Sequence, residues 1–122
     1  MLTVEYCAQK DVIDGLYREL GITLPASGSN FVLREDGVPI GLMRTEISDV
    51  VSITHFNLVK SAMNRENREF FLRAMLYKFS LNPVPLAADG DWEELAQFGF
   101  RRESGRYVIN SADVNLHGKC KG

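Results

Sequence analysis

The stretch VVSITHFNLV (residues 50–59), followed closely by SAMNRENREFFLRAM (residues 61–75), decides the fold. The first part is rich in β-branched and aromatic residues, which favour a strand. In the second part Asn64 can cap a helix, and the helical pattern ends before Pro83. VPLAA (residues 84–88) is then typical of a short buried strand. A strand, a helix and another strand in succession predict a parallel pair of strands joined by a helical crossover.

Two features of this segment bear on its place in the fold. Apolar residues between positions 64 and 79 cover most of the helix circumference, so we expect this helix to lie buried between layers. Pro85 cannot donate a backbone hydrogen bond inside a sheet. It therefore predicts either an edge position or a local split in the sheet at this strand.

The N-terminal half predicts a strand, a helix and an antiparallel meander. Residues 2–7 are typical of a short strand, and Asp11 can cap the amphipathic helix that follows, which Gly21 ends. Two strands are predicted at residues 31–34 and 38–46, around an Asp-Gly pair that favours a hairpin turn. Together with the strand quoted first, they form three consecutive antiparallel strands.

The C-terminal part predicts a second, smaller helix and a final hairpin. Asp91 can cap a short helix over residues 92–98, and residues 100–103 and 106–109 can pair around a Ser-Gly turn. The complete order is β-α-β-β-β-α-β-α-β-β. It predicts an α/β (α+β mixed sheet) fold, with helices on both faces of a central twisted sheet.

Length and composition favour one globular domain. The chain has 122 residues, 45% of them hydrophobic and 25% charged, so we expect one domain over residues 1–114 and a polar tail over residues 115–122. A net charge of −2 argues against a nucleic-acid partner. The sequence has no apolar run of about 18 residues, so we expect no membrane span. Cys7 and Cys120 lack the spacing of a metal site, and we expect reduced thiols in a cytoplasmic protein.

Four segments, in order and over residues 3–110, resemble the GCN5-related N-acetyltransferase (GNAT) superfamily. One is similar to the opening helix of that family, one to its hairpin, one to its cofactor motif and one to its closing helix and hairpin. They are AQKDVIDGLYREL, FVLREDGVPIGLMRTEIS, HFNLVKSAMNRENREFFLRAM and WEELAQFGFRRESGRYVI. The resemblance implies a divergent member with this family's sandwich fold.

The resemblance also implies that the chain binds acetyl-coenzyme A. In such proteins two parallel strands splay apart, and the exposed backbone of the first pairs with the pantetheine arm; the equivalent residues here are Phe56, Asn57 and Leu58. The diphosphate binds at the start of the next helix, where bare N–H groups and the helix dipole favour an anion. The positions that match this helix start are Asn64, Arg65, Glu66, Asn67 and Arg68.

The helix start departs from the family pattern. The family's loop has small residues that let phosphate oxygens approach the backbone, whereas Glu66 and Arg68 stand at those positions here. The Glu66 carboxylate opposes a diphosphate, while Arg65 and Arg68 can bind one through their side chains. The alternative is an ordinary helix start, with Asn64 as the cap and solvated arginines.

The resemblance carries few catalytic residues over. Leu95 stands where many members have a tyrosine that protonates the leaving thiolate. His55 is the best candidate for a base that accepts the proton of an amine, because its ordinary pKa lies near neutrality, and Glu46 is the second candidate. The alternatives are a hydrogen-bonded strand histidine and a solvated carboxylate.

Three functional hypotheses follow. The first is an acyl-coenzyme A-dependent N-acyltransferase whose acceptor is a small-molecule or peptide amine. The second is a binding or regulatory module that kept the fold without using acetyl-coenzyme A, and the third is a subunit that docks onto a larger partner. The short connection over residues 22–30 suggests an open acceptor cleft or one completed by a second subunit, as in a homodimer.

Overall fold

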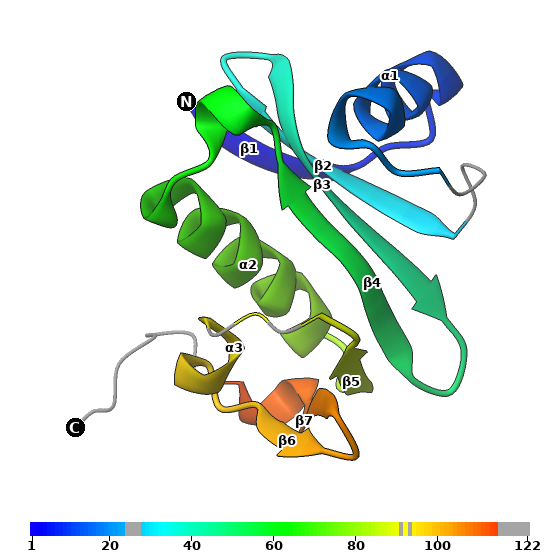
Figure 1. Cartoon of the computed structure of the whole chain (residues 1–122). Helices are drawn as coiled ribbons and strands as arrows, with labels where there is room; N and C mark the ends of the chain where they lie inside the picture. Colours follow the sequence, from blue (N-terminus) through cyan, green and yellow to red (C-terminus); the bar gives the residue numbers. More distant parts are fainter. Residues whose placement is uncertain (24–27, 91, 93, 115–122) are drawn as a thin grey trace.

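The computed structural model describes residues 1–23, 28–90, 92 and 94–114 (Figure 1). Its strands form one seven-stranded mixed sheet in the order β1-β2-β3-β4-β5-β7-β6. The strands are β1 (Leu2–Tyr6), β2 (Ser29–Glu35), β3 (Val38–Ile47), β4 (Val51–Leu58), β5 (Pro85–Ala88), β6 (Arg101–Glu103) and β7 (Arg106–Asn110). The helices are α1 (Lys10–Leu20), α2 (Arg65–Ser80) and α3 (Glu94–Gln97), with 3-10 turns η1 (Lys60–Ala62) and η2 (Ser111–Asp113).

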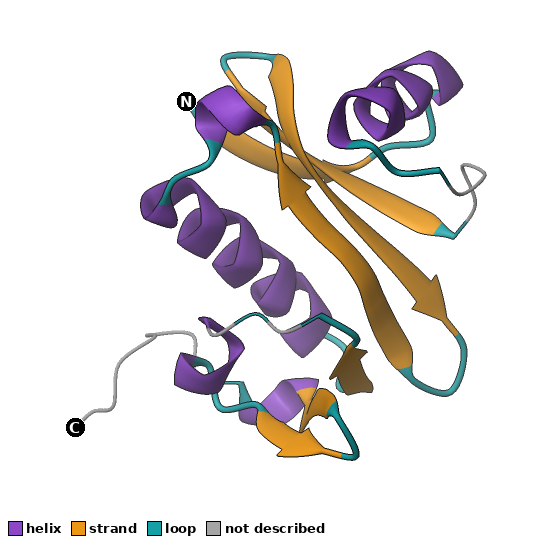
Figure 2. Ribbon diagram, in the orientation of Figure 1, coloured by secondary structure: helices purple, strands orange, loops and turns teal. Residues whose placement is uncertain are grey.

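The strand pairings confirm the predicted topology. Strands β1 to β4 form an antiparallel series, and β4 and β5 are parallel, joined by the α2 crossover (Figure 2). The predicted turn between β2 and β3 has positive φ values at Asp36 (50°) and Gly37 (87°), as a tight hairpin requires. The β6–β7 turn likewise has positive φ values at Ser104 and Gly105.

Helices α1 and α2 cover opposite faces of the sheet. Tyr17 of α1 donates a hydrogen bond to Asn30 at 2.7 Å, whereas the next residue of β2, Phe31, packs edge-to-face on Phe79 of α2. Successive strand residues point to opposite faces, so these two contacts place the helices on opposite sides. The predicted arrangement, with helices on both faces, is confirmed.

Helix α1 ends where predicted but begins earlier than predicted. The N-cap is Gln9, which makes no side-chain cap, and Asp11 lies within the first turn, where its negative charge favours the helix dipole. The predicted cap at Asp11 is therefore wrong by two positions. Gly21 ends the helix in the left-handed conformation with φ 74°, as predicted.

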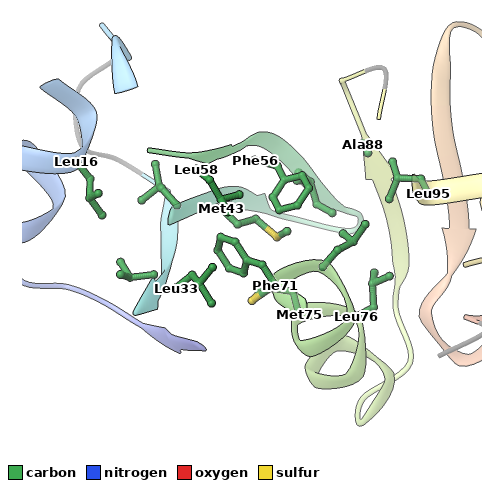
Figure 3. Packing of buried hydrophobic residues seen from close by; sticks show 14 of the residues in the cluster. Leu16, Leu33, Met43, Phe56, Leu58, Phe71, Met75, Leu76, Ala88 and Leu95 are labelled. Atoms are coloured by element: carbon green, nitrogen blue, oxygen red, sulfur yellow. The ribbon is translucent and has the colours of Figure 1, made fainter. Parts of the chain in front are cut away.

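The core lies mainly between α2 and the sheet (Figure 3). Four side chains of α2 are fully buried on the side that faces the sheet: Phe71, Leu72, Met75 and Leu76. The opposite side of α2 is not covered by described residues, since Phe70 and Tyr77 are 37% and 54% exposed. The expectation of a helix buried between layers is wrong, because an apolar count does not show which side meets the sheet.

Pro85 is the first residue of β5, a position that tolerates proline, and it precedes the β4–β5 pairs. Strand β5 lies between β4 and β7, and the split lies at its other end, after Ala88, so neither the predicted edge nor the split explains this proline. The predicted cap Asp91, residues 24–27 of the loop after α1 and the predicted tail lie outside the described residues. No helix in the described part of the chain has the length and hydropathy needed to cross a membrane.

Candidate functional site

The sheet opens between β4 and β5. The two strands pair only over Val51↔Leu86, Ser52↔Ala87 and Ile53↔Ala88, and the last rung is the hydrogen bond from the Asp89 N–H to the Ile53 carbonyl at 3.1 Å. Strand β4 continues to Leu58 without β5 beside it (Figure 1). The predicted opening is confirmed.

A β-bulge marks the point where β4 leaves β5. In the β3–β4 ladder Arg44 pairs with His55 and Thr45 with Ile53, so Thr54 is the extra residue. A bulge bends its strand and increases the local twist. Because Thr54 directly follows the last β4–β5 pair, the bulge contributes to the separation of the two strands.

Two of the three predicted backbone positions face the opening. The N–H of Val59 donates to the Ile40 carbonyl at 2.9 Å, so the backbone of Val59 faces the β3 side. Backbone polar groups alternate along a strand. Asn57 therefore also faces β3, while the N–H and C=O groups of Phe56 and Leu58 face the side from which β5 has diverged.

The start of α2 combines a side-chain cap with two backbone N–H groups that lack a partner among the described residues. The Asn64 side chain caps the helix, as predicted, by accepting from the backbone N–H of Asn67 at 2.8 Å. The side-chain amide of Asn67 donates to the Ala62 carbonyl at 2.9 Å. Within the described part of the chain, the N–H groups of Arg65 and Glu66 have no hydrogen-bond partner. These N–H groups and the helix dipole favour an anion.

An ion pair joins α2 to α3 beside the opening. The Arg68 guanidinium binds Glu94 through two hydrogen bonds, of 2.5 and 3.2 Å, and both side chains are only about one-fifth exposed. The hydrogen bond from Arg68 lowers the pKa of Glu94, against the opposing effect of burial. The same guanidinium lies 4.6 Å from the Phe56 ring centroid, and Trp92 packs edge-to-face on that ring at 5.5 Å. Side chains of the protein therefore cover the α2 side of the opening.

On the other face, the predicted pair His55 and Glu46 are connected through Arg44. Arg44 is 4% exposed, and its Nη1 lies 2.9 Å from both Glu46 Oε2 and Thr54 Oγ1. The Thr54 hydroxyl lies 3.2 Å from the Arg44 carbonyl, and Thr54 Oγ1 lies 3.1 Å from His55 Nδ1. In the neutral tautomer with its proton on Nδ1, this nitrogen donates to Thr54 and Nε2 carries the lone pair.

Electrostatics favour a neutral His55. Burial lowers the pKa of His55 below its ordinary value, the positive charge of Arg44 lowers it further, and Glu46 acts in the opposite direction. A neutral imidazole at neutral pH can accept a proton, which is what a general base must do. Leu95, at the position of the family's tyrosine, is fully buried and cannot donate one.

Sequence reasoning missed the groups that this fold brings together over long separations. Arg68 and Glu94 are 26 positions apart, and Arg106 and Asp89 are 17 positions apart. No local motif indicates either pair. Arg44 did carry a signal, because a charged residue inside an apolar strand requires a polar partner if it is buried.

Comparison with known proteins identifies the architecture. No protein-family model matches the sequence, and no curated protein matches it significantly. Among solved structures, a GNAT family acetyltransferase from Brucella melitensis in complex with acetyl-CoA superposes with a TM-score of 0.69, at 11% identity, over 90% of this chain and 88% of that one. The chain has the GNAT fold.

Other acetyltransferases share this GNAT fold. The ribosomal-protein-S18-alanine N-acetyltransferase from Escherichia coli gives a TM-score of 0.66 at 13% identity, over 90% of both chains. A GNAT family N-acetyltransferase from Escherichia coli in complex with CoA gives 0.66 at 15% identity, over 93% of this chain and 82% of that one. The predicted fold class and the resemblance are thereby confirmed at the level of architecture.

Proposed function

We propose that the protein binds an acyl-coenzyme A, with acetyl-CoA as the expected form, and transfers the acyl group to an amine. The observation that carries this proposal is the opening after Ile53, where the backbone groups of Phe56 and Leu58 are turned away from β3. Two solved structures with the same fold, at low sequence identity, are complexes with acetyl-CoA or CoA.

The residues at the opening fit such a ligand. The amides of a pantetheine arm can pair with Phe56 and Leu58 as an added strand does. The diphosphate can accept from the N–H groups of Arg65 and Glu66. To bind the guanidinium groups of Arg65 and Arg68, it must compete with their carboxylate partners Glu69 and Glu94. The Glu66 carboxylate opposes this anion, so the arginine side chains replace part of what a glycine-rich loop supplies.

The chemistry requires a base on the other face of β4. The thioester supplies an activated acyl carbon to which the amine nitrogen bonds while the carbon–sulfur bond breaks, and coenzyme A leaves as the thiolate. His55 Nε2 accepts the proton that the amine loses. Thr54 holds the imidazole by its Nδ1, and Glu46 is the second candidate for the base. A thiolate is a good leaving group, so the leucine at position 95 is compatible with transfer.

A non-catalytic module is the second candidate. It is favoured by the Arg68–Glu94 ion pair and by Trp92, which cover the α2 side of the opening, and by the absence of a proton donor at Leu95. In such a module these contacts stay closed, and the fold serves to bind a partner.

Coenzyme A binding distinguishes the two candidates. We expect CoA at about 100 times its dissociation constant to raise the free energy of unfolding by about 2.7 kcal/mol, measured by thermal or urea unfolding and by calorimetry. ATP is the matched control, because it has a polyphosphate and an adenosine but no pantetheine arm. No stabilisation by millimolar CoA would favour the module, and equal stabilisation by ATP would contradict a role for the β4 edge.

A further inference from the structure

A cavity of about 310 Å³ lies over β5 and β7, on the sheet face that carries Glu46 and His55. This volume is at the lower end of the range of about 300–1,000 Å³ for small-molecule sites. Strand register places Ser52, Ala87 and Val108 side by side on this face. The lining residues are Val50, Pro85, Leu86, Ala87, Arg101, Arg106, Val108, Ile109 and Asn110.

The floor of this cavity is apolar, and the charged residues that line it are both arginines. Arg101 lies opposite Val108 in the β6–β7 register, and Arg106 precedes Val108 by two residues on β7, so both point to the same face. Such a combination suits a ligand that has an anionic group beside an apolar part. A guanidinium binds a carboxylate through two parallel hydrogen bonds.

The acidic partners of these arginines leave room for a ligand. Arg106 binds Asp89 at 2.8 Å, with side chains 41% and 47% exposed, and Arg101 binds Glu103 at 3.1 Å, with side chains 72% and 54% exposed. Exposed pairs of this kind contribute little free energy and exchange readily. The contacts of Arg106 with described residues use its Nε and Nη2 groups, so several of its five N–H donors remain for a ligand.

Arg106 also lies at the base of the opening. Its Nη2 donates to Ser52 Oγ at 3.3 Å, and Ser52 precedes Ile53, the last β4 residue paired with β5. Its other partner, Asp89, makes the final rung with Ile53. A carboxylate bound to Arg106 would therefore be anchored where β4 and β5 separate, three positions along β4 from His55.

We propose that this cavity is the acceptor site and that the acceptor is a small amine with a carboxylate and an apolar side chain, the chemistry of an α-amino acid. The proposal rests on the acyltransferase function proposed above. Arg106, assisted by Arg101, binds the carboxylate, and the side chain packs on Ala87 and Val108. The amine is then turned toward the opening. Its nitrogen bonds to the acyl carbon as the carbon–sulfur bond breaks, and its proton passes to His55.

Acyl transfer to matched amines tests this specificity. With acetyl-CoA, we expect kcat/KM for leucine, methionine and phenylalanine to exceed that for leucinamide by about ten-fold or more, because the amide lacks the charge that Arg106 binds. Arg106→Gln should remove this preference by raising KM for leucine much more than KM for leucinamide, whereas Arg18→Gln, on the exposed side of α1, should change neither. Equal rates for acid and amide, or equal losses for both in Arg106→Gln, would overturn the proposal.

Product binding without coenzyme A separates this inference from the proposed function. By NMR titration, N-acetylleucine should shift the amide signals of Arg106 and Val108, with about ten-fold weaker binding in Arg106→Gln or Arg101→Gln and for N-acetylleucinamide. If CoA does not bind but this response persists, the acyltransferase function is wrong and the carboxylate site stands. If CoA binds and the cavity does not respond, the acceptor proposal alone is wrong.

Discussion

Glu94→Gln is expected to tighten CoA binding by about ten-fold while lowering the free energy of unfolding by about 1–2 kcal/mol. The variant removes the carboxylate that binds Arg68 through two hydrogen bonds at the side of the opening. Hydrogen bonds to charged groups contribute about 1.5–3 kcal/mol, and a diphosphate must compete with Glu94 for the same guanidinium. Calorimetric titration with CoA and urea unfolding measure the two effects.

Two further variants test whether this effect depends on Arg68. Asp14→Asn is the matched control, because it removes an acidic partner of Lys10 on α1, far along the chain from the opening, and should leave CoA binding unchanged. Arg68→Gln should weaken CoA binding. If Glu94→Gln binds CoA no better than the original chain, or Arg68→Gln binds equally well, then Arg68 has no part in holding the diphosphate.

Phe71→Ala is expected to lower the free energy of unfolding by about 3–5 kcal/mol, which is a large part of the stability of a domain of this size. The Phe71 ring is fully buried, packs on Phe56 at 5.5 Å between centroids, and lies where a side chain on Gly41 would be 3.2 Å from it. Removing it leaves a cavity between α2 and the sheet. Urea unfolding measured by circular dichroism gives the value.

Phe70→Ala provides the control for this prediction. Phe70 is the preceding residue on α2 and is 37% exposed on the outer side of the helix, so its truncation should cost less than about 1 kcal/mol. Similar losses for the two variants would mean that α2 is rotated relative to the arrangement in Figure 3.

The contrast between these two phenylalanines also shows what the sequence could and could not predict. The Asp-Gly turn, the helix end at Gly21 and the Asn64 cap are local signals, and the structure confirms each of them. The orientation of α2 is not local, because apolar residues on all sides of a helix indicate burial without indicating which side meets the sheet. The expectation that α2 lies buried between layers failed at Phe70 and Tyr77 for that reason.

In the candidate site, too, the sequence did not predict the features that depend on non-local packing. The opening between β4 and β5 was predicted from a resemblance, but nothing in the sequence indicated the bulge at Thr54 or showed at which end of β5 the strands separate. The bulge depends on how β4 pairs with β3. The contacts of Arg68 with Glu94 and of Arg106 with Asp89 depend on the packing of α3 and β7, which short-range patterns do not encode.

Amide hydrogen exchange in the presence and absence of CoA tests most directly whether coenzyme A pairs with the exposed edge of β4. Measured by NMR at saturating CoA, exchange of the Phe56 and Leu58 amides should slow by about ten-fold or more, because both N–H groups would gain acceptors from the pantetheine arm. The Val59 amide, which already donates to Ile40, should change little. Unchanged exchange at Phe56 and Leu58 while CoA is bound would contradict this binding site.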